Sequence, residues 1–277
     1  MRSNRVWVGV AAAASLASSV LGSHHIMQIQ KVIGGVGGDT TAQAIQLRQR
    51  FAGQNLVSFG RIRAWDANGA NPVLIIDFTA NVPNSASGDT VLVCTNSFKS
   101  KTSPTTTPDF TMTNPIPPSY LAAGRLTFEF DGGTIWWSLA WGGASYTGSN
   151  AVDLTNDSDG NAGPAFGQSL PTASTTALQY TGGASGASTT NAANYAISAP
   201  GAIVTNNARV SFTVKAPCPG DFNGDAFVDD ADFVVFAAAY DQLICGNPCP
   251  ADLNADTFVD DADFVLFAAA YNDLICP

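Results

Sequence analysis

The chain has 277 residues and a formal net charge of −10. That charge is concentrated at one end, because residues 218–277 contain 12 Asp and no Glu, Lys, Arg or His. Carboxylates packed at this density repel phosphate, so the composition argues against nucleic acid as a partner. They also repel one another unless a cation neutralises them, and this favours bound metal.

The first 22 residues have the pattern of an export signal. Arg2 and Arg5 precede an apolar, alanine-rich stretch from Val6 to Leu21, and Gly22–Ser23 is the expected cleavage site. Such a stretch is too short and wrongly flanked for a membrane span, and no later stretch has 18 uninterrupted apolar residues. We therefore predict a protein that is secreted or held at the cell surface, with no membrane span.

Residues 24–214 read as β structure. Short runs of β-forming residues alternate with clusters of Gly, Asn, Pro, Ser and Thr, and no long helical period intervenes. The expected strands are His25–Ile33, Ala44–Arg50, Arg61–Trp65, Val73–Ala80, Thr90–Thr95, Arg125–Phe130, Thr134–Trp141, Ala177–Tyr180, Tyr195–Ser198 and Ala208–Val214. The pattern predicts a mainly β chain with an N-terminal two-sheet β-sandwich over 24–214, a proline-containing linker over 215–219 and a small all-α domain over 220–277.

The β segment shows no catalytic constellation, and we expect a non-enzymatic protein. Glu129, the one glutamate of the chain, alternates with Asp131 and offers a glycosidase pair, but two glycines follow Asp131 and favour a turn there. Trp136 points away from the face that holds Ile135, Trp137, Leu139 and Trp141. It either stacks on a sugar ring or is covered by a loop. The alternative function is therefore a carbohydrate-binding or polysaccharide-degrading component.

The C-terminal segment is an internal duplication. Residues 218–246 and 249–277 are identical at 21 of 29 aligned positions. Each copy contains an acidic loop followed by an apolar helix that begins near Ala231 or Ala262. On each helix one face is expected at i, i+3, i+4 and i+7, formed by Phe233, Phe236, Ala237 and Tyr240 in the first copy and by Phe264, Phe267, Ala268 and Tyr271 in the second.

Each loop places oxygen-bearing residues at positions 1, 3, 5, 9 and 12, with position 7 available through its backbone carbonyl. This alternation matches the six to eight oxygen ligands of Ca²⁺, so we predict two Ca²⁺ sites. The ligands in the first loop are Asp221, Asn223, Asp225, Phe227, Asp229 and Asp232, and those in the second are Asp252, Asn254, Asp256, Phe258, Asp260 and Asp263. An acidic helix cap without metal is the other interpretation.

Two positions depart from a standard EF-hand loop. Position 6 is Ala226 or Thr257 instead of glycine, so that residue must take an unusual backbone angle at a cost of about 1 kcal/mol. Position 12 is Asp instead of Glu. One methylene is missing, and the helix must start closer to the ion.

The duplicated D-x-N-x-D-x-x-V-D-x-x-D loop with a single following helix resembles a type I dockerin over residues 218–277. This resemblance implies calcium binding and docking to a cohesin-like or other surface protein, in some cases within a polysaccharide-degrading assembly. In that family loop positions 10 and 11 contact the partner and are often hydroxylic. Here they are Asp230 and Ala231, then Asp261 and Ala262, which departs from that pattern.

Four cysteines bracket the repeats. In an exported protein they indicate two disulfides, and zinc is disfavoured because no histidine lies nearby. If the two helices pack antiparallel, the end of one meets the start of the other, which favours Cys218–Cys276 and Cys245–Cys249 over pairing within each repeat. Cys94 stands alone and is expected to be a buried thiol.

The β segment contains two further, weaker patterns. Asp157, Asp159 and Asn161 alternate in a polar turn, which is either a third calcium site or an ordinary turn. The segments IQKVIGG, AIQLR and PPSYLAAG are similar to secreted lamin-tail-like sandwiches, and this similarity implies a sandwich fold for residues 24–214.

Overall fold

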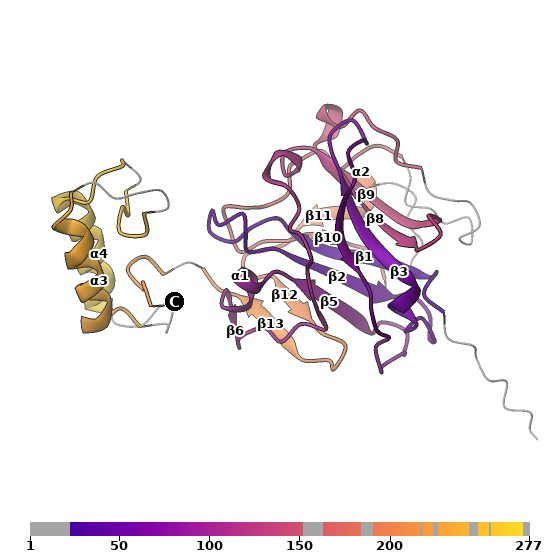
Figure 1. The fold of residues 1–277 in the computed structure, drawn as a ribbon, viewed down its shortest axis with the longest axis horizontal. Coiled ribbons are helices and arrows are strands. Elements are labelled where there is room, and N and C mark those ends of the chain that lie inside the picture. The colour runs from indigo at the N-terminus through magenta and orange to yellow at the C-terminus, as the bar shows by residue number, and fades with distance from the viewer. Residues whose placement is uncertain are drawn as a thin grey trace, which may run out of the picture.

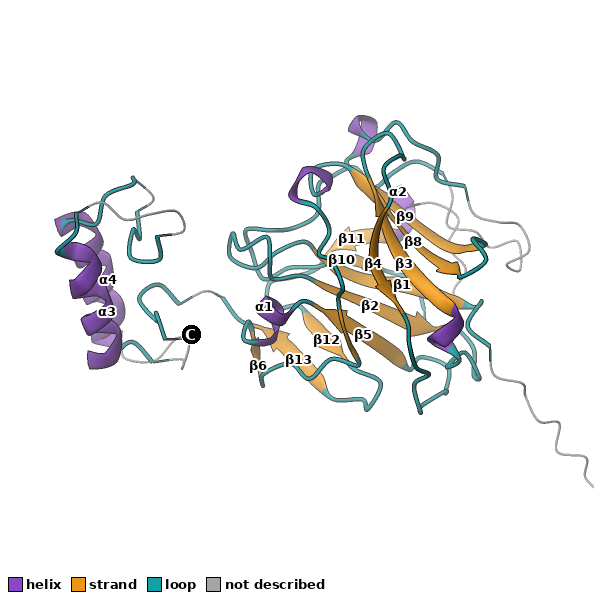
Figure 2. Ribbon diagram, viewed as in Figure 1, coloured by secondary structure: helices purple, strands orange, loops and turns teal. Residues whose placement is uncertain are grey.

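The computed structural model describes residues 23–151, 163–183, 191–216, 218–223, 227–243, 249–254 and 256–273. The expected signal (1–22), Asp225, Ala226, Cys245, Cys276 and the turn with Asp157, Asp159 and Asn161 lie outside the described residues. We call residues 23–216 the β region and residues 218–273 the C-terminal unit. Figure 2 shows the strands in the β region and the two longest helices in the C-terminal unit.

The described β region forms three sheets, so the mainly β prediction is confirmed. The largest has the order β11-β10-β1-β2-β5-β7, a second has β4-β3-β8-β9, and a third has β12-β13-β6. The strands are β1 Met27–Ile33, β2 Ala44–Gln49, β3 Gly60–Trp65, β4 Val73–Asp77, β5 Thr90–Cys94, β6 Thr102–Ser103, β7 Phe110–Thr111, β8 Gly124–Phe130, β9 Ile135–Trp141, β10 Leu178–Tyr180, β11 Tyr195–Ile197, β12 Ile203–Thr205 and β13 Ser211–Val214. Each of the ten expected strands is present, within a few residues of its predicted ends.

The six-stranded sheet has apolar residues on both faces. Val91 and Val93 of β5 join the core shared with the four-stranded sheet, while Leu92 and Cys94 join the core shared with the three-stranded sheet. Successive side chains of a strand point to opposite faces, so this alternation requires a cover on each side. The prediction of two sheets is therefore incomplete, because the three-stranded sheet covers the second face of the six-stranded sheet as a third layer.

Short helical segments connect the strands, and the two longer helices follow them in the chain. The short ones are η1 Val57–Phe59, α1 Asn96–Lys99, η2 Pro118–Tyr120, η3 Gly143–Ser145 and α2 Asn191–Asn194. The longer ones are α3 Asp230–Tyr240 and α4 Asp261–Asp273. Figure 1 shows α3 and α4 lying side by side in the C-terminal unit.

The C-terminal unit has its own small core. Val228 and Phe236 from the first repeat meet Val259 and Phe267 from the second, and each of these side chains is at most 1% exposed. Corresponding residues of the two repeats thus contribute in pairs, as expected for a duplicated sequence that packs against itself.

Candidate metal centre

The start of each helix is built by two loop carboxylates. The Oδ1 atom of Asp229 accepts a hydrogen bond from the backbone N–H of Ala231 at 2.9 Å, and Asp232 accepts one from the N–H of Asp229 at 3.1 Å. This reciprocal capping box satisfies N–H groups that have no partner within the helix. Asp260 and Asp263 make the same bonds in the second repeat. As a result the helices begin at Asp230 and Asp261, one residue earlier than expected.

The carboxylates at position 12 also hold the beginning of each loop. Asp263 accepts hydrogen bonds from the N–H groups of Leu253 at 2.7 Å and Asn254 at 3.0 Å, both through Oδ1. Asp232 does the same with Phe222 at 2.7 Å and Asn223 at 3.1 Å. Both aspartates are fully buried. A buried carboxylate is stable only when it is paired or hydrogen-bonded, and here three backbone donors supply that stabilisation.

The second loop brings carboxylates from positions 1, 5 and 12 together. Oxygen atoms of Asp252, Asp256 and Asp263 lie within 4.8 Å of one another. Ca²⁺ binds oxygens at about 2.3–2.6 Å, so ligands on opposite sides of the ion are about 5 Å apart. The cluster has the dimensions of such a site. Three negative charges at this spacing also repel one another, and a divalent cation would remove that repulsion.

Backbone hydrogen bonds curl the second loop around these carboxylates. The N–H groups of Asp256 and Thr257 donate to Asp252 at 3.0 and 2.8 Å, and the N–H of Phe258 donates to Asp256 at 2.9 Å. The expected strain at position 6 is confirmed for Thr257, whose φ is +80°. Left-handed backbone at a β-branched residue is costly, so the surrounding bonds must hold it in place.

The remaining predicted ligands lie on the same two loops. Asp221, Asp252, Asp229 and Asp260 are half-buried, whereas the side chains of Asn223, Asn254 and Asp256 are exposed. Phe227 and Phe258 leave about half of their side chains exposed, as expected where only the carbonyl would serve as a ligand. The described ligands of the second loop therefore lie on a capped and curled segment, and those of the first loop precede a helix that is capped in the same way.

The two repeats clasp each other through reciprocal hydrogen bonds. The hydroxyl of Tyr240, at the end of α3, donates to Asp261 at the start of α4. The hydroxyl of Tyr271 donates to Asp230 at the start of α3 at 2.5 Å. The helices are thus antiparallel, which confirms the premise of the expected cross-repeat disulfides. The pKa of each tyrosine is raised. The larger cause is the hydrogen bond to the carboxylate, and the second is the negative charge of that carboxylate.

An aromatic stack fills the space between the helices. Phe236 and Phe267 lie 4.9 Å apart between ring centroids, and Phe222 lies 5.9 Å from Phe267 at an interplanar angle of 7°. Phe222 occupies position 2 of the first loop, between two predicted ligands. The geometry of the first loop is therefore joined directly to the packing of the helices.

The predicted helix faces are confirmed, because the four residues of each face line the same hollow. Phe236 and Phe267 are 1% exposed, but Phe233 and Phe264 of the same expected faces are each 44% exposed. Two antiparallel helices meet along a narrow line, and one phenylalanine per helix fills most of it. The clasps between Tyr and Asp were not foreseen. They join residues 21 and 41 positions apart, and the only sequence signal for them is that each repeat carries the same Asp and Tyr.

The cysteines are described only in part. Cys218 and Cys249 are partly buried against the core of the C-terminal unit, and their expected partners fall outside the described residues. Which cysteines pair stays a prediction. Cys94 is free and fully buried, and burial raises the pKa of its thiol to about 12, so it packs as an apolar side chain.

Glu129 has a structural environment. It is fully buried, and it pairs with Arg63 at 2.6 Å and Arg61 at 3.1 Å while Thr127 donates a further hydrogen bond. Asp131 is exposed at the turn between β8 and β9, as the glycines after it indicated. The Glu129 carboxylate is held by two arginines and serves as their counter-ion. Glu129 is buried and Asp131 is exposed, so the two carboxylates do not share one enclosed site.

Trp136 lies at the edge of the β region beside the first described residues. Its ring is 5.8 Å from that of His25 and 6.3 Å from that of His24, so it is partly covered. A hollow of about 350 Å³ remains there, lined by Trp136, Phe130 and Thr134 together with Ser23, His24 and His25. The prediction that Trp136 is covered is therefore confirmed in part, and its stacking on a sugar ring stays a prediction.

Within the described residues, no helix is both long and apolar enough to cross a membrane. No family model, curated protein or solved structure matches this chain.

Proposed function

We propose that the C-terminal unit is a calcium-binding, dockerin-like module that docks an exported, non-enzymatic β protein to a partner at the cell surface or in an extracellular assembly. The observation that carries this proposal is the convergence of Asp252, Asp256 and Asp263 within 4.8 Å in the second loop. The first loop makes the same hydrogen bonds to its aspartate at position 12. Hard, multidentate oxygen sites of this kind favour Ca²⁺ over the smaller and more strongly hydrated Mg²⁺.

The residues of the described loops fit the ion. Positions 1, 5 and 12 supply charged oxygens in the second loop, and position 7 leaves its side chain outside. When bound, calcium supplies positive charge and a fixed coordination shell. The chain itself contributes the capped helix starts, the Tyr–Asp clasps and the aromatic stack. Calcium would therefore stabilise a helix pair whose exposed side chains are available to a partner.

Calcium titration of the full chain by calorimetry tests the proposal. We expect two binding events per chain, and one event in Asp221→Ala or Asp252→Ala, each of which removes a position-1 ligand from one loop. Asp77→Ala, an exposed carboxylate of β4, serves as the matched control and should keep both events. No calcium binding by the unaltered chain would refute the proposal.

A second candidate function is carbohydrate binding at the Trp136 hollow. Aromatic faces at an open hollow suit the apolar face of a sugar ring, and Phe130 and Trp136 supply them. If this candidate holds, glycan-array binding will be present in the full chain and absent in Trp136→Ala. Phe51→Ala, at an aromatic residue that is 48% exposed elsewhere in the β region, should leave it unchanged. Equal signals from all three proteins would reject it.

A further inference from the structure

Each helix of the pair exposes large apolar side chains. Residues at three consecutive positions of each helix are between 42% and 67% exposed, namely Phe233, Val234, Val235, Phe264, Val265 and Leu266. Consecutive helical positions are about 100° apart, so these side chains point to different sides, and Phe233 and Phe264 are the two that meet on one face of the helix pair. Exposed apolar side chains gathered on one face mark contact surfaces. Corresponding residues of the two repeats are exposed, so the exposure is a property of the repeat.

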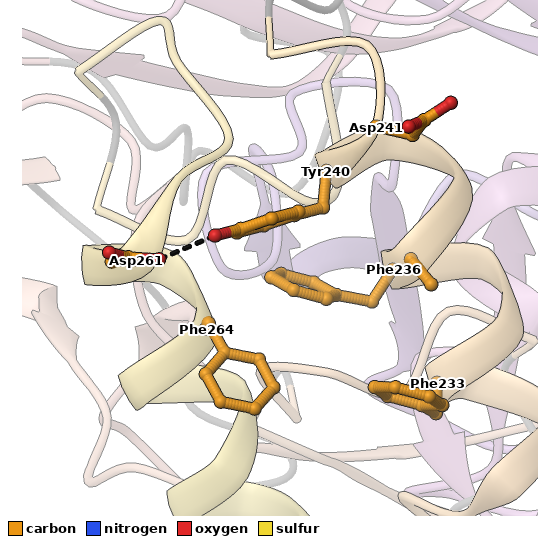
Figure 3. A pocket seen from close by; sticks show the side chains of 7 residues that line it. Phe233, Phe236, Tyr240, Asp241, Asp261 and Phe264 are labelled. Atoms are coloured by element: carbon orange, nitrogen blue, oxygen red, sulfur yellow. Dashed lines mark hydrogen bonds between the residues drawn. The ribbon is translucent and has the colours of Figure 1, made fainter.

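Two hollows lie beside Phe233 and Phe264, and carboxylates border both. One, of about 400 Å³, is lined by Phe233, Phe264 and Tyr240 with Asp241 and Asp261 at its rim. The other, of about 340 Å³, is lined by the same two phenylalanines and by Tyr271, with Asp230 at its rim. Figure 3 shows the first, with the Tyr240–Asp261 clasp closing one side and Phe233 facing Phe264 across the opening.

The charge of the unit decides what can cover this face. Residues 218–277 hold 12 Asp and no cationic side chain, so even two bound Ca²⁺ would leave the unit strongly negative. A second copy would bring an equal negative charge to the interface, and like charges at this distance cost free energy. A partner with Lys or Arg around an apolar centre would instead pair with Asp230, Asp241 and Asp261.

We propose that this face of α3 and α4 binds a protein segment that presents apolar side chains flanked by Lys or Arg. The apolar side chains fill the two hollows beside Phe233 and Phe264, and the cations reach the carboxylates at the rims. The Tyr–Asp clasps keep Asp230 and Asp261 at the rims and turned toward the helix pair. This inference rests on the proposed docking function and adds the chemistry of the partner.

A synthetic amphipathic peptide with Leu on one helical face and Lys on the other is the probe. Its binding to the calcium-saturated full chain is measured by fluorescence anisotropy, beside a scrambled peptide of the same composition and a peptide with Glu in place of Lys. We expect the Lys peptide to bind at least tenfold more tightly than either control. High salt should weaken its binding, because the rim contacts are exposed charges.

Two variants locate the binding. The double variant Phe233→Ser/Phe264→Ser should lose at least tenfold in affinity for the Lys peptide, and Asp241→Asn should lose several-fold. Phe51→Ser, at a similarly exposed phenylalanine of the β region, should lose nothing. Retention of two calcium-binding events in each variant shows that the unit is still folded.

Besides the absence of peptide binding, three results would overturn the inference. They are equal affinity of the unaltered chain and the double variant, preference for the Glu peptide, and calcium-dependent self-association in ultracentrifugation that the double variant abolishes, which would assign the face to a second copy. Two calcium events without peptide binding reject only this inference, whereas the absence of calcium binding rejects the proposed function.

Discussion

Replacing Asp263 with alanine is expected to remove calcium binding at the second loop and to destabilise the C-terminal unit by about 3 kcal/mol. The side chain is fully buried and accepts hydrogen bonds from the N–H groups of Leu253, Asn254 and Asp260. Its loss leaves these donors without their acceptor, removes one of the two reciprocal capping bonds at the start of α4 and removes one corner of the Asp252–Asp256–Asp263 cluster.

Calorimetry gives both readouts for this variant. Calcium titration should change from two events to one, and the unfolding transition of the C-terminal unit should move to lower temperature. Asp273→Ala is the matched control, because that carboxylate is exposed at the last residue of α4. Removing it should change stability little, or raise it slightly, since a negative charge at a helix C-terminus is unfavourable. An Asp263 variant with two calcium events and an unchanged transition would show that position 12 is neither ligand nor anchor.

Replacing Phe267 with alanine should cost about 3–5 kcal/mol, because a fully packed aromatic ring leaves a cavity when it is removed. Its ring stacks on Phe236 at 4.9 Å and on Phe222 at 5.9 Å, and it is 1% exposed. Phe222 lies between Asp221 and Asn223 in the first loop. The variant should therefore weaken calcium binding at the first loop, although Phe267 belongs to the second repeat.

Phe264→Ala is the control for this prediction. It makes the same chemical change three residues earlier on the same helix, where the side chain is 44% exposed, and it should cost less than half as much. Chemical denaturation followed by tyrosine fluorescence and circular dichroism compares the two variants. Tryptophan fluorescence reports on the β region, since residues 218–277 contain no tryptophan, and should be the same in both. Equal losses of stability would show that the stack does not hold the helices together.

Ten of the thirteen described strands of the β region were predictable because each carries its signal within a few residues, whereas β12, which has three residues like β10 and β11, was not expected. Alternation in β3 and β8, or a dense apolar run in β5, is visible without knowledge of the fold. β6 and β7 are two residues long each and are formed by pairing with β13 and β5, so no local period announces them. The continuous apolar sequence of β5 indicates a strand that is buried on both faces, but it does not indicate which strands pack against the second face.

In the candidate metal loops, too, the features set by neighbours along the chain were predictable and those set by distant contacts were not. The ligand spacing, the capping residues and the strain at Thr257 all act over about twelve residues and follow from the loop pattern. The inward position of Phe267, the exposure of Phe264 and the clasp of Tyr271 on Asp230 depend on where the other repeat lies. Both phenylalanines have the same apolar character, so composition could not separate them.

The sequence by itself determined the duplicated acidic loops, their helices, the mainly β character of the rest and the excess of negative charge in the last 60 residues. These are short-range properties, because a hydrogen-bonded turn, a helix cap or a strand period involves neighbours along the chain. Only the tertiary structure decided the third sheet, the burial of Glu129 between two arginines, and the antiparallel pairing that gathers exposed phenylalanines and aspartates on one face. Those features join residues far apart in the chain, whose contacts arise only when separately formed elements pack together.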